Sequence, residues 1–198
     1  MDDNLFIEFD TEKEIENSLK KLDETLTLAS TDTYQWKWAI IILHNCIQNC
    51  MILSLRATND ANIIKYHKNK FPKSFKDYIN NLEIIEQAKI IDYLELYDRI
   101  KNEKYMKSFI GSKHFIPEEK HNYSMNEINE IRNNFIHFKP QTWLIEIELI
   151  TDIFKSVVEI INFLIFESGN CIYRFNENQI DKIKLYITNI NRNLNRTS

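Results

Sequence analysis

Hydrophobic residues near the start of the chain recur every three or four positions, which is the spacing of one face of an amphipathic helix. Thr11 and Glu14 form a capping-box pattern before this run, and the run ends near Ala29. The pattern therefore predicts a helix over residues 11–29, preceded by a flexible segment at residues 1–10. The apolar face of this helix consists of Ile15, Leu19, Leu22 and Leu26.

The next run, residues 34–57, is apolar on nearly every side, which predicts a helix at the centre of a bundle. A narrow polar stripe interrupts it with two pairs at i, i+4 spacing, His44 with Gln48 and Asn45 with Asn49. Two interpretations of this stripe are open. Its side chains either face a functional site and supply hydrogen bonds to it, or they are buried polar groups satisfied by neighbouring helices.

The middle of the chain has a weaker pattern. Lysines alternate with aromatic residues over residues 65–76, and such a segment is either an RNA-contacting loop or a solvated connection. Helical character returns over residues 84–100. We expect residues 104–123 to form a loop, from which either histidine, His114 or His121, is a candidate to enter an active site.

Two helices are expected at the C-terminal end of the chain. One covers residues 141–168, and the Gly169-Asn170 pair ends it. The last helix lies within residues 170–198, is capped by Asn176 and Gln179, and is expected to pack on the bundle. The apolar stripes of the two helices are Trp143, Ile147, Ile150, Phe154, Val157, Ile161 and Leu164, and Ile180, Ile183, Ile187, Ile190 and Leu194.

Composition favours a helical fold. The 198 residues include only two glycines and three prolines, which leaves little turn chemistry for an all-β protein, and 43% are hydrophobic, enough to bury a core. We therefore expect residues 1–198 to form a single all-α domain, a bundle of about five to six helices. The two longest apolar stretches, residues 38–55 and 143–166, are broken by polar and charged side chains, so we expect core helices and no membrane association.

The net charge and the cysteine content argue against some classes of function and some kinds of site. The formal net charge of −4 argues against binding nucleic acid through bulk electrostatics, but it allows an RNase whose basic residues are local. The three cysteines, Cys46, Cys50 and Cys171, form neither an even disulfide set nor a zinc-type spacing. We therefore expect a cytoplasmic protein without a metal site or cofactor.

One expected helix, over about residues 125–137 with a capping-box pattern at Ser124, carries groups suited to chemistry. On it Arg132 is followed by Asn133 and, further on, His137. At 3.6 residues per turn, Asn133 and His137 share a face, whereas Arg132 lies roughly 140° around the helix from His137. An imidazole moves a proton near neutral pH and a guanidinium holds two phosphate oxygens, so the pair suits phosphodiester cleavage. Either Arg132 reaches around its helix, or another surface completes the site.

The Arg132-x4-His137 spacing, with a polar residue directly after the arginine, resembles the R-x(4 to 6)-H motif of the HEPN superfamily, helical domains that often act as RNases. The chain that follows resembles bacterial HEPN proteins of roughly this size, and the resemblance extends from about Tyr34 onward. The residues that carry this second likeness are the Phe-Ile-His-Phe run at 135–138, Pro140, Trp143, Ile145 and Glu146.

The resemblance implies a metal-independent endoribonuclease in which the RNA 2′-hydroxyl attacks the adjacent phosphate. His137 would transfer the proton, Arg132 would neutralise charge on the phosphoryl oxygens, and Asn133 would orient His137 or the phosphate. Two such helices commonly meet across a homodimer in this superfamily, which would bring one subunit's Arg132 to the other's His137. The candidate substrate-binding residues are His44, Asn45, Gln48 and Lys139.

The family also suggests how such an enzyme is controlled. A toxin or anti-phage role, with an antitoxin or other regulatory protein as partner, is implied by the resemblance alone. In HEPN toxins paired with a nucleotidyltransferase antitoxin, a modified tyrosine follows the histidine by two positions. Lys139 occupies that position here, which puts control by tyrosine modification in doubt.

Alternatives of another class remain open. The motif is also compatible with an ordinary helix end, where Arg132 pairs with an acidic neighbour such as Glu127 or Glu130 and His137 caps the last carbonyls. The chain would then be a non-catalytic helical module that binds nucleotide, RNA or a protein partner. An internal ion pair of Arg132 would favour the module over the enzyme.

Overall fold

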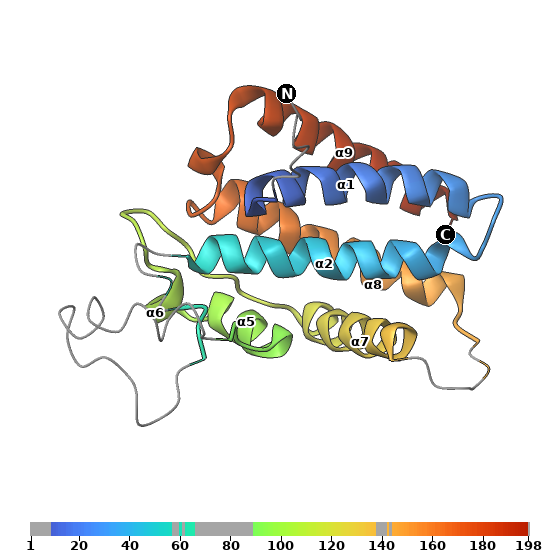
Figure 1. Cartoon of the computed structure of the whole chain (residues 1–198), viewed down its shortest axis with the longest axis horizontal. Coiled ribbons are helices and arrows are strands. Elements are labelled where there is room, and N and C mark those ends of the chain that lie inside the picture. The colour runs from blue at the N-terminus through green and yellow to red at the C-terminus, as the bar shows by residue number, and fades with distance from the viewer. Residues whose placement is uncertain are drawn as a thin grey trace, which may run out of the picture.

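The computed structural model describes residues 9–56, 60, 62–65, 89–137, 142 and 144–197. Within these residues the chain forms seven α-helices and no strands, which confirms the predicted all-α bundle (Figure 1). The helices are α1 (Thr11–Ala29), α2 (Gln35–Leu55), α5 (Tyr93–Ile100), α6 (Glu103–Met106), α7 (Glu119–Ile136), α8 (Ile147–Asn162) and α9 (Glu177–Thr197).

The helices lie in three layers (Figure 1). α1 and α9 pack side by side in one outer layer, α2 and α8 form the middle layer, and α5 and α7 form the other outer layer. A single cluster of buried hydrophobic side chains extends through all three layers. α2 contacts α1 on one side of the bundle and α5 and α7 on the other.

α2 is the central helix, as its nearly continuous apolar sequence predicts. Most of its side chains are buried, and a polar stripe remains on the side that the other helices leave partly open. By length and composition alone α2 is long enough and apolar enough to cross a membrane, but 67% of its apolar window is buried inside the bundle. Core helices of soluble proteins share these properties.

The predicted N-terminal caps of α1 and α9 had different outcomes. α1 covers the predicted residues, but its N-cap is Asp10, whose Oδ1 accepts a hydrogen bond from the Lys13 amide at 2.6 Å, and not Thr11. At the start of α9 the prediction is confirmed. The Gln179 amide donates to Asn176 Oδ1 at 3.0 Å, and the Asn176 amide donates to Gln179 Oε1 at 3.1 Å.

α7 begins earlier than the sequence predicts. Its N-cap is Glu118, which forms a capping box with His121, and Ser124 is a buried residue within the helix and not its cap. The loop predicted over residues 104–123 is therefore wrong for the segment from Glu119 onward, and it is also interrupted by α6. The sequence did not indicate this cap because the third residue of the helix, whose side chain accepts a hydrogen bond from the N-cap amide, is His121, whereas a capping box usually has Glu or Gln there.

α8 is shorter than predicted. Residues 144–146 are not helical, the α-helix spans Ile147–Asn162, and a π-helical turn follows at Phe163–Glu167. Gly169 then leaves the helix with a φ of 77°, a conformation that favours glycine. Trp143, predicted on the apolar stripe, lies outside the described residues.

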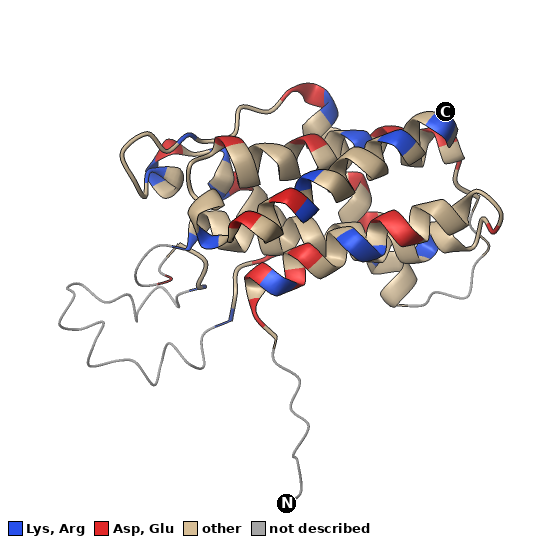
Figure 2. Cartoon of the chain, turned by 90° about the horizontal axis from the view of Figure 1, so that it is seen from above, with Lys and Arg blue, Asp and Glu red and all other residues tan. Residues whose placement is uncertain are grey.

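Charged side chains are mixed along the helices. Figure 2 shows basic and acidic positions interspersed on the described part of the bundle. The lysine-rich segment of residues 65–76 lies almost entirely outside the described residues, so its predicted RNA contact stays a prediction. Directly before this segment, Ile64 forms an isolated antiparallel β-bridge with Ile90.

Candidate functional site

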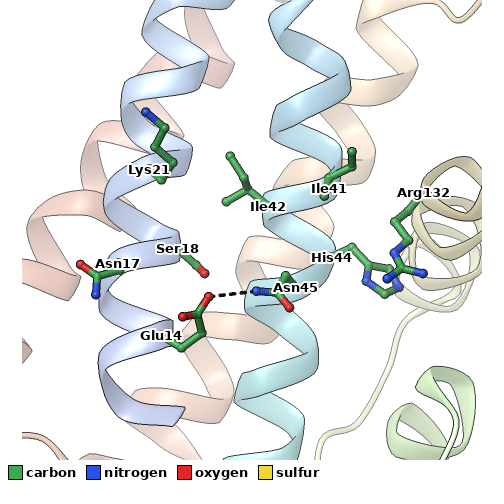
Figure 3. A pocket seen from close by; sticks show the side chains of 9 residues that line it. All are labelled: Glu14, Asn17, Ser18, Lys21, Ile41, Ile42, His44, Asn45 and Arg132. Atoms are coloured by element: carbon green, nitrogen blue, oxygen red, sulfur yellow. Dashed lines mark hydrogen bonds between the residues drawn. The ribbon is translucent and has the colours of Figure 1, made fainter. Parts of the chain in front are cut away.

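A pocket of about 350 Å³ lies across the partly open side of α2, between α1 and α7 (Figure 3). Ile41 and Ile42 form its apolar floor on α2. α1 contributes one wall, and Arg132 reaches in from α7 on the other side. The full lining consists of Glu14, Asn17, Ser18, Lys21, Ile41, Ile42, His44, Asn45 and Arg132.

Arg132 lies in the last two turns of α7, where its side chain is partly buried. Its Nη1 donates to Asn133 Oδ1 at 2.9 Å. No carboxylate among the described residues pairs with Arg132, so the internal ion pair with Glu127 or Glu130 is not formed there. Because a guanidinium stays charged and carries five N–H donors, most of its binding capacity is unused.

His44 lies beside Arg132 at the α7 end of the pocket (Figure 3). It is 2% exposed and stacks on Tyr93, with ring centroids 4.1 Å apart. Its Nε2 is 3.2 Å from Asn129 Oδ1, while its Nδ1 is buried without a hydrogen-bond partner in the described part of the chain. Burial, aided by the charge of Arg132 and opposed by the Asn129 hydrogen bond, lowers the pKa of His44 from 6.5 to about 4.

A neutral His44 explains how an imidazole and a guanidinium share this space. At neutral pH the ring carries no charge, so it does not repel Arg132. With Nε2 donating to Asn129, the ring nitrogen Nδ1 keeps a free lone pair. Buried polar atoms are normally paired, so Nδ1 is an unsatisfied acceptor close to Arg132.

The opposite wall carries a carboxylate and a lysine. Asn45 Nδ2 donates to Glu14 Oε1 at 3.2 Å, which links α2 to α1 across the pocket (Figure 3). Lys21 lies farther along the same face of α1 and pairs with Glu24 at 3.2 Å, with both side chains largely exposed. The pocket therefore has a negative group at Glu14 and positive groups at Arg132 and Lys21.

His137 occupies a different place from Arg132. It is the C-cap of α7, its amide donates to the Asn133 carbonyl at 2.9 Å, and its side chain is exposed. Within the described residues its imidazole has no hydrogen bond, and it does not line the pocket. Within one chain the structure thus places Arg132 with His44 and not with His137.

Apart from His137, the predicted site residues separate into three groups. Arg132, His44 and Asn45 line one pocket, and Asn133 supports Arg132 through a hydrogen bond. Gln48 is partly buried on α2 outside the pocket lining. Lys139 lies outside the described residues.

The α1 wall was not predicted from the sequence. Glu14, Asn17 and Lys21 recur at i, i+3 and i+7, so they share one face of α1, and this polar face is a signal that the sequence contains. The signal is weak because solvated faces of amphipathic helices look the same. Only the packing of α1 against α2 distinguishes this one.

Metal binding finds no support in the described part of the chain. No group of three or more His, Cys, Asp or Glu side chains there is arranged to hold an ion. Cys46, Cys50 and Cys171 are buried and free, and burial raises the pKa of the Cys171 thiol to about 12. Such thiols behave as small core residues.

Comparison with known proteins gives no further guide. No family model, no curated protein sequence and no solved structure matches this chain.

Proposed function

We propose that the chain is a metal-independent endoribonuclease whose active site forms when Arg132 of one subunit meets His137 of a second copy. The observation that carries this proposal is the state of Arg132. Its guanidinium is partly buried, lacks a carboxylate partner in the described residues, and lines an open pocket. A partly buried cation without a carboxylate partner is stabilised when an anion such as a phosphate binds to it.

Two histidines are candidates for the proton transfer, and their environments favour His137. Burial lowers the pKa of His44 to about 4, so His44 is a poor proton carrier near neutral pH. His137 is exposed at the end of α7, where a substrate or a second subunit can reach it. An imidazole that a substrate can reach is suited to act as a general acid and base.

The proposed chemistry needs no group beyond these side chains. The 2′-hydroxyl oxygen of RNA forms a bond to the adjacent phosphorus, and the bond from phosphorus to the 5′-oxygen breaks. His137 takes the proton of the attacking hydroxyl and returns it to the departing 5′-oxygen. Arg132, held by Asn133, neutralises the charge on the phosphoryl oxygens. The products are a 2′,3′-cyclic phosphate and a 5′-hydroxyl.

A homodimer would resolve the separation of the two groups. Arg132 and His137 lie roughly 140° apart around α7, and the pocket of one chain contains only the arginine. In a symmetric dimer each contact occurs twice, so one subunit's Arg132 can approach the other's His137 in two equivalent sites. A toxin or anti-phage role, with an antitoxin or other regulatory protein as partner, stays a prediction.

A direct test is RNA cleavage in excess EDTA by the purified protein and by its His137→Ala variant. We expect fragments with cyclic phosphate ends from the wild type and at least a 100-fold lower rate from the variant. The matched control is His114→Ala, which removes a histidine far from Arg132 in sequence and should cleave as the wild type does. Absence of cleavage by a folded, dimeric wild type would contradict the proposal.

One observation favours a second candidate, a non-catalytic module that binds an anionic ligand. Arg132 lies beside the neutral His44 in a pocket that one chain forms by itself, so anion binding there would not need a dimer. The two candidates differ in their dependence on His137. A module would keep ligand affinity in the His137→Ala variant and would cleave no RNA.

A further inference from the structure

We propose that the pocket between α1, α2 and α7 binds one ribonucleotide unit, with its phosphate on Arg132 and its ribose hydroxyls on Glu14 and Asn45. The assignment of this unit to an RNA substrate rests on the proposed nuclease function, whereas the pocket itself does not.

The phosphate belongs at the α7 end of the pocket. Arg132 uses Nη1 for Asn133 Oδ1 and leaves its other N–H donors free, and this planar fork matches two phosphate oxygens. His44 beside it is uncharged at neutral pH and has an unpartnered Nδ1 among the described residues. Arg132 is therefore the group that binds the phosphate at this end of the pocket, and the neutral His44, whose Nδ1 can only accept hydrogen bonds, adds no charge that competes with it.

The ribose belongs at the α1 end. The Glu14 carboxylate accepts one hydrogen bond from Asn45, and no described Lys or Arg forms a salt bridge with it. A carboxylate has room for several donors, so Glu14 can accept from sugar hydroxyls as well. In dinucleotide-binding folds, an acidic side chain likewise accepts a hydrogen bond from a ribose hydroxyl.

The charges fix the orientation of the ligand. Glu14 would repel a phosphate, so the phosphate lies toward Arg132 and the hydroxyls lie toward Glu14 (Figure 3). Between the two ends, Ile41 and Ile42 supply an apolar floor for the sugar and base. The volume of about 350 Å³ is near the lower end of the range for small-molecule pockets, which suits one unit and not several.

The test measures binding by calorimetry to the full-length His137→Ala protein, which removes cleavage from the experiment. The probes are adenosine 5′-monophosphate and its 2′-deoxy counterpart. We expect the ribonucleotide to bind at least about tenfold more tightly, because it alone offers the 2′-hydroxyl to a charged acceptor. Equal affinities, or no binding of either probe, would overturn the proposal.

Two substitutions assign the ends of the pocket. Glu14→Gln keeps an oxygen for the Asn45 hydrogen bond but loses the charge, so it should reduce the preference for ribose over deoxyribose to within about twofold. Arg132→Gln should weaken both probes by at least about tenfold. Lys20→Gln removes an exposed charge from α1 outside the pocket and should change neither affinity. If Glu14→Gln leaves the ribose preference intact, the assignment of that end is wrong.

A third probe identifies the source of the nucleotide and separates this inference from the nuclease. A dinucleoside monophosphate of RNA that binds more tightly than the mononucleotide indicates an RNA chain, and the reverse order indicates a free nucleotide. Ribose-selective binding by a protein that cleaves no RNA would support the pocket and reject the nuclease. RNA cleavage by the wild type, together with no ribose preference, would support the nuclease and reject the pocket.

Discussion

The two ends of α7 each carry a histidine, and the two are held in opposite ways. At the N-terminal end His121 is buried, its Nδ1 accepts from the Glu118 amide at 3.0 Å, and its Nε2 is 2.9 Å from Glu159 Oε2. At the C-terminal end His137 is exposed and its imidazole has no hydrogen bond within the described residues. Both ring nitrogens of His121 form hydrogen bonds, whereas neither ring nitrogen of His137 has a partner in the part of the chain that the structure describes.

This difference shows which histidine can take part in chemistry. Because Nδ1 of His121 accepts from an amide, Nε2 carries the proton and donates to Glu159, so the tautomer is fixed. The edge of Phe115 also packs against the ring. His121 therefore connects α7 to α8, whereas the exposed His137 can change position without disturbing the core. Substitutions at the two ends should have opposite consequences.

The largest effect is expected at His137. His137→Ala should lower the rate of RNA cleavage by at least about 100-fold, because the proton transfer is lost. Its free energy of unfolding should change by less than about 0.5 kcal/mol, because the side chain is exposed. Single-turnover cleavage and urea denaturation measure the two quantities. A large loss of stability would show that His137 is a structural residue like His121.

His121→Ala should lower the stability of the protein but leave its cleavage rate nearly unchanged. It leaves the Glu118 amide and the Glu159 carboxylate without their partner and removes a buried ring, which should cost about 2 kcal/mol of unfolding free energy. Below its lowered melting temperature the variant should cleave RNA at a rate close to that of the wild type. Urea denaturation at neutral pH is the measurement. An unchanged stability would mean that the capping box and the contact with α8 contribute nothing.

His44 is a third histidine, and its lowered pKa should make the free energy of unfolding depend on pH. Its pKa is about 4 in the folded protein and 6.5 ordinarily, so between these values the unfolded chain binds more protons. Stability should therefore fall as pH decreases from about 6.5 to about 4, by at most about 1.4 kcal/mol per pH unit. His44→Gln has no ionisable ring, and its stability should be less steep in this window. Parallel curves for the two proteins would contradict the buried, neutral state of His44.

The smallest effect is expected at Glu159, the partner of His121. Burial raises the pKa of Glu159, but hydrogen bonds from Lys120 and His121 outweigh this and hold it below its usual value. The side chain is 51% exposed, so the Lys120 ion pair at 2.7 Å contributes little. Glu159→Gln keeps an acceptor for His121 and should cost less than about 1 kcal/mol in urea denaturation. A cost as large as that of His121→Ala would mean that the charge of Glu159 is the main stabilising group.

Local signals made part of this fold predictable. The span of α1 follows from the periodicity of Ile15, Leu19, Leu22 and Leu26, and the reciprocal cap at Asn176 and Gln179 is a pattern within four residues. The start of α7 was not predictable in the same way. Ser124 matched the usual cap signal, while the real cap at Glu118 uses His121, which reads as a loop residue in sequence.

The site was less predictable than the fold because it depends on packing between distant elements. Arg132 and His137 share a helix and a motif, yet the pocket combines Arg132 with His44 through the contact of α7 with α2. Glu14 joins through the contact of α1 with α2. Helical spacing left open whether Arg132 reaches around its helix or another surface completes the site, and it could not identify His44 as the histidine beside Arg132.

The central claim, an active site shared between subunits, is tested most directly by subunit complementation. Arg132→Gln and His137→Ala chains with different tags are co-expressed, and the mixed dimer is purified through both tags. One of its two shared sites combines intact Arg132 with intact His137, so the mixed dimer should recover about half of wild-type cleavage in EDTA. Each variant alone should be at least about 100-fold slower. A mixed dimer as inactive as its parents would contradict a shared Arg132–His137 site.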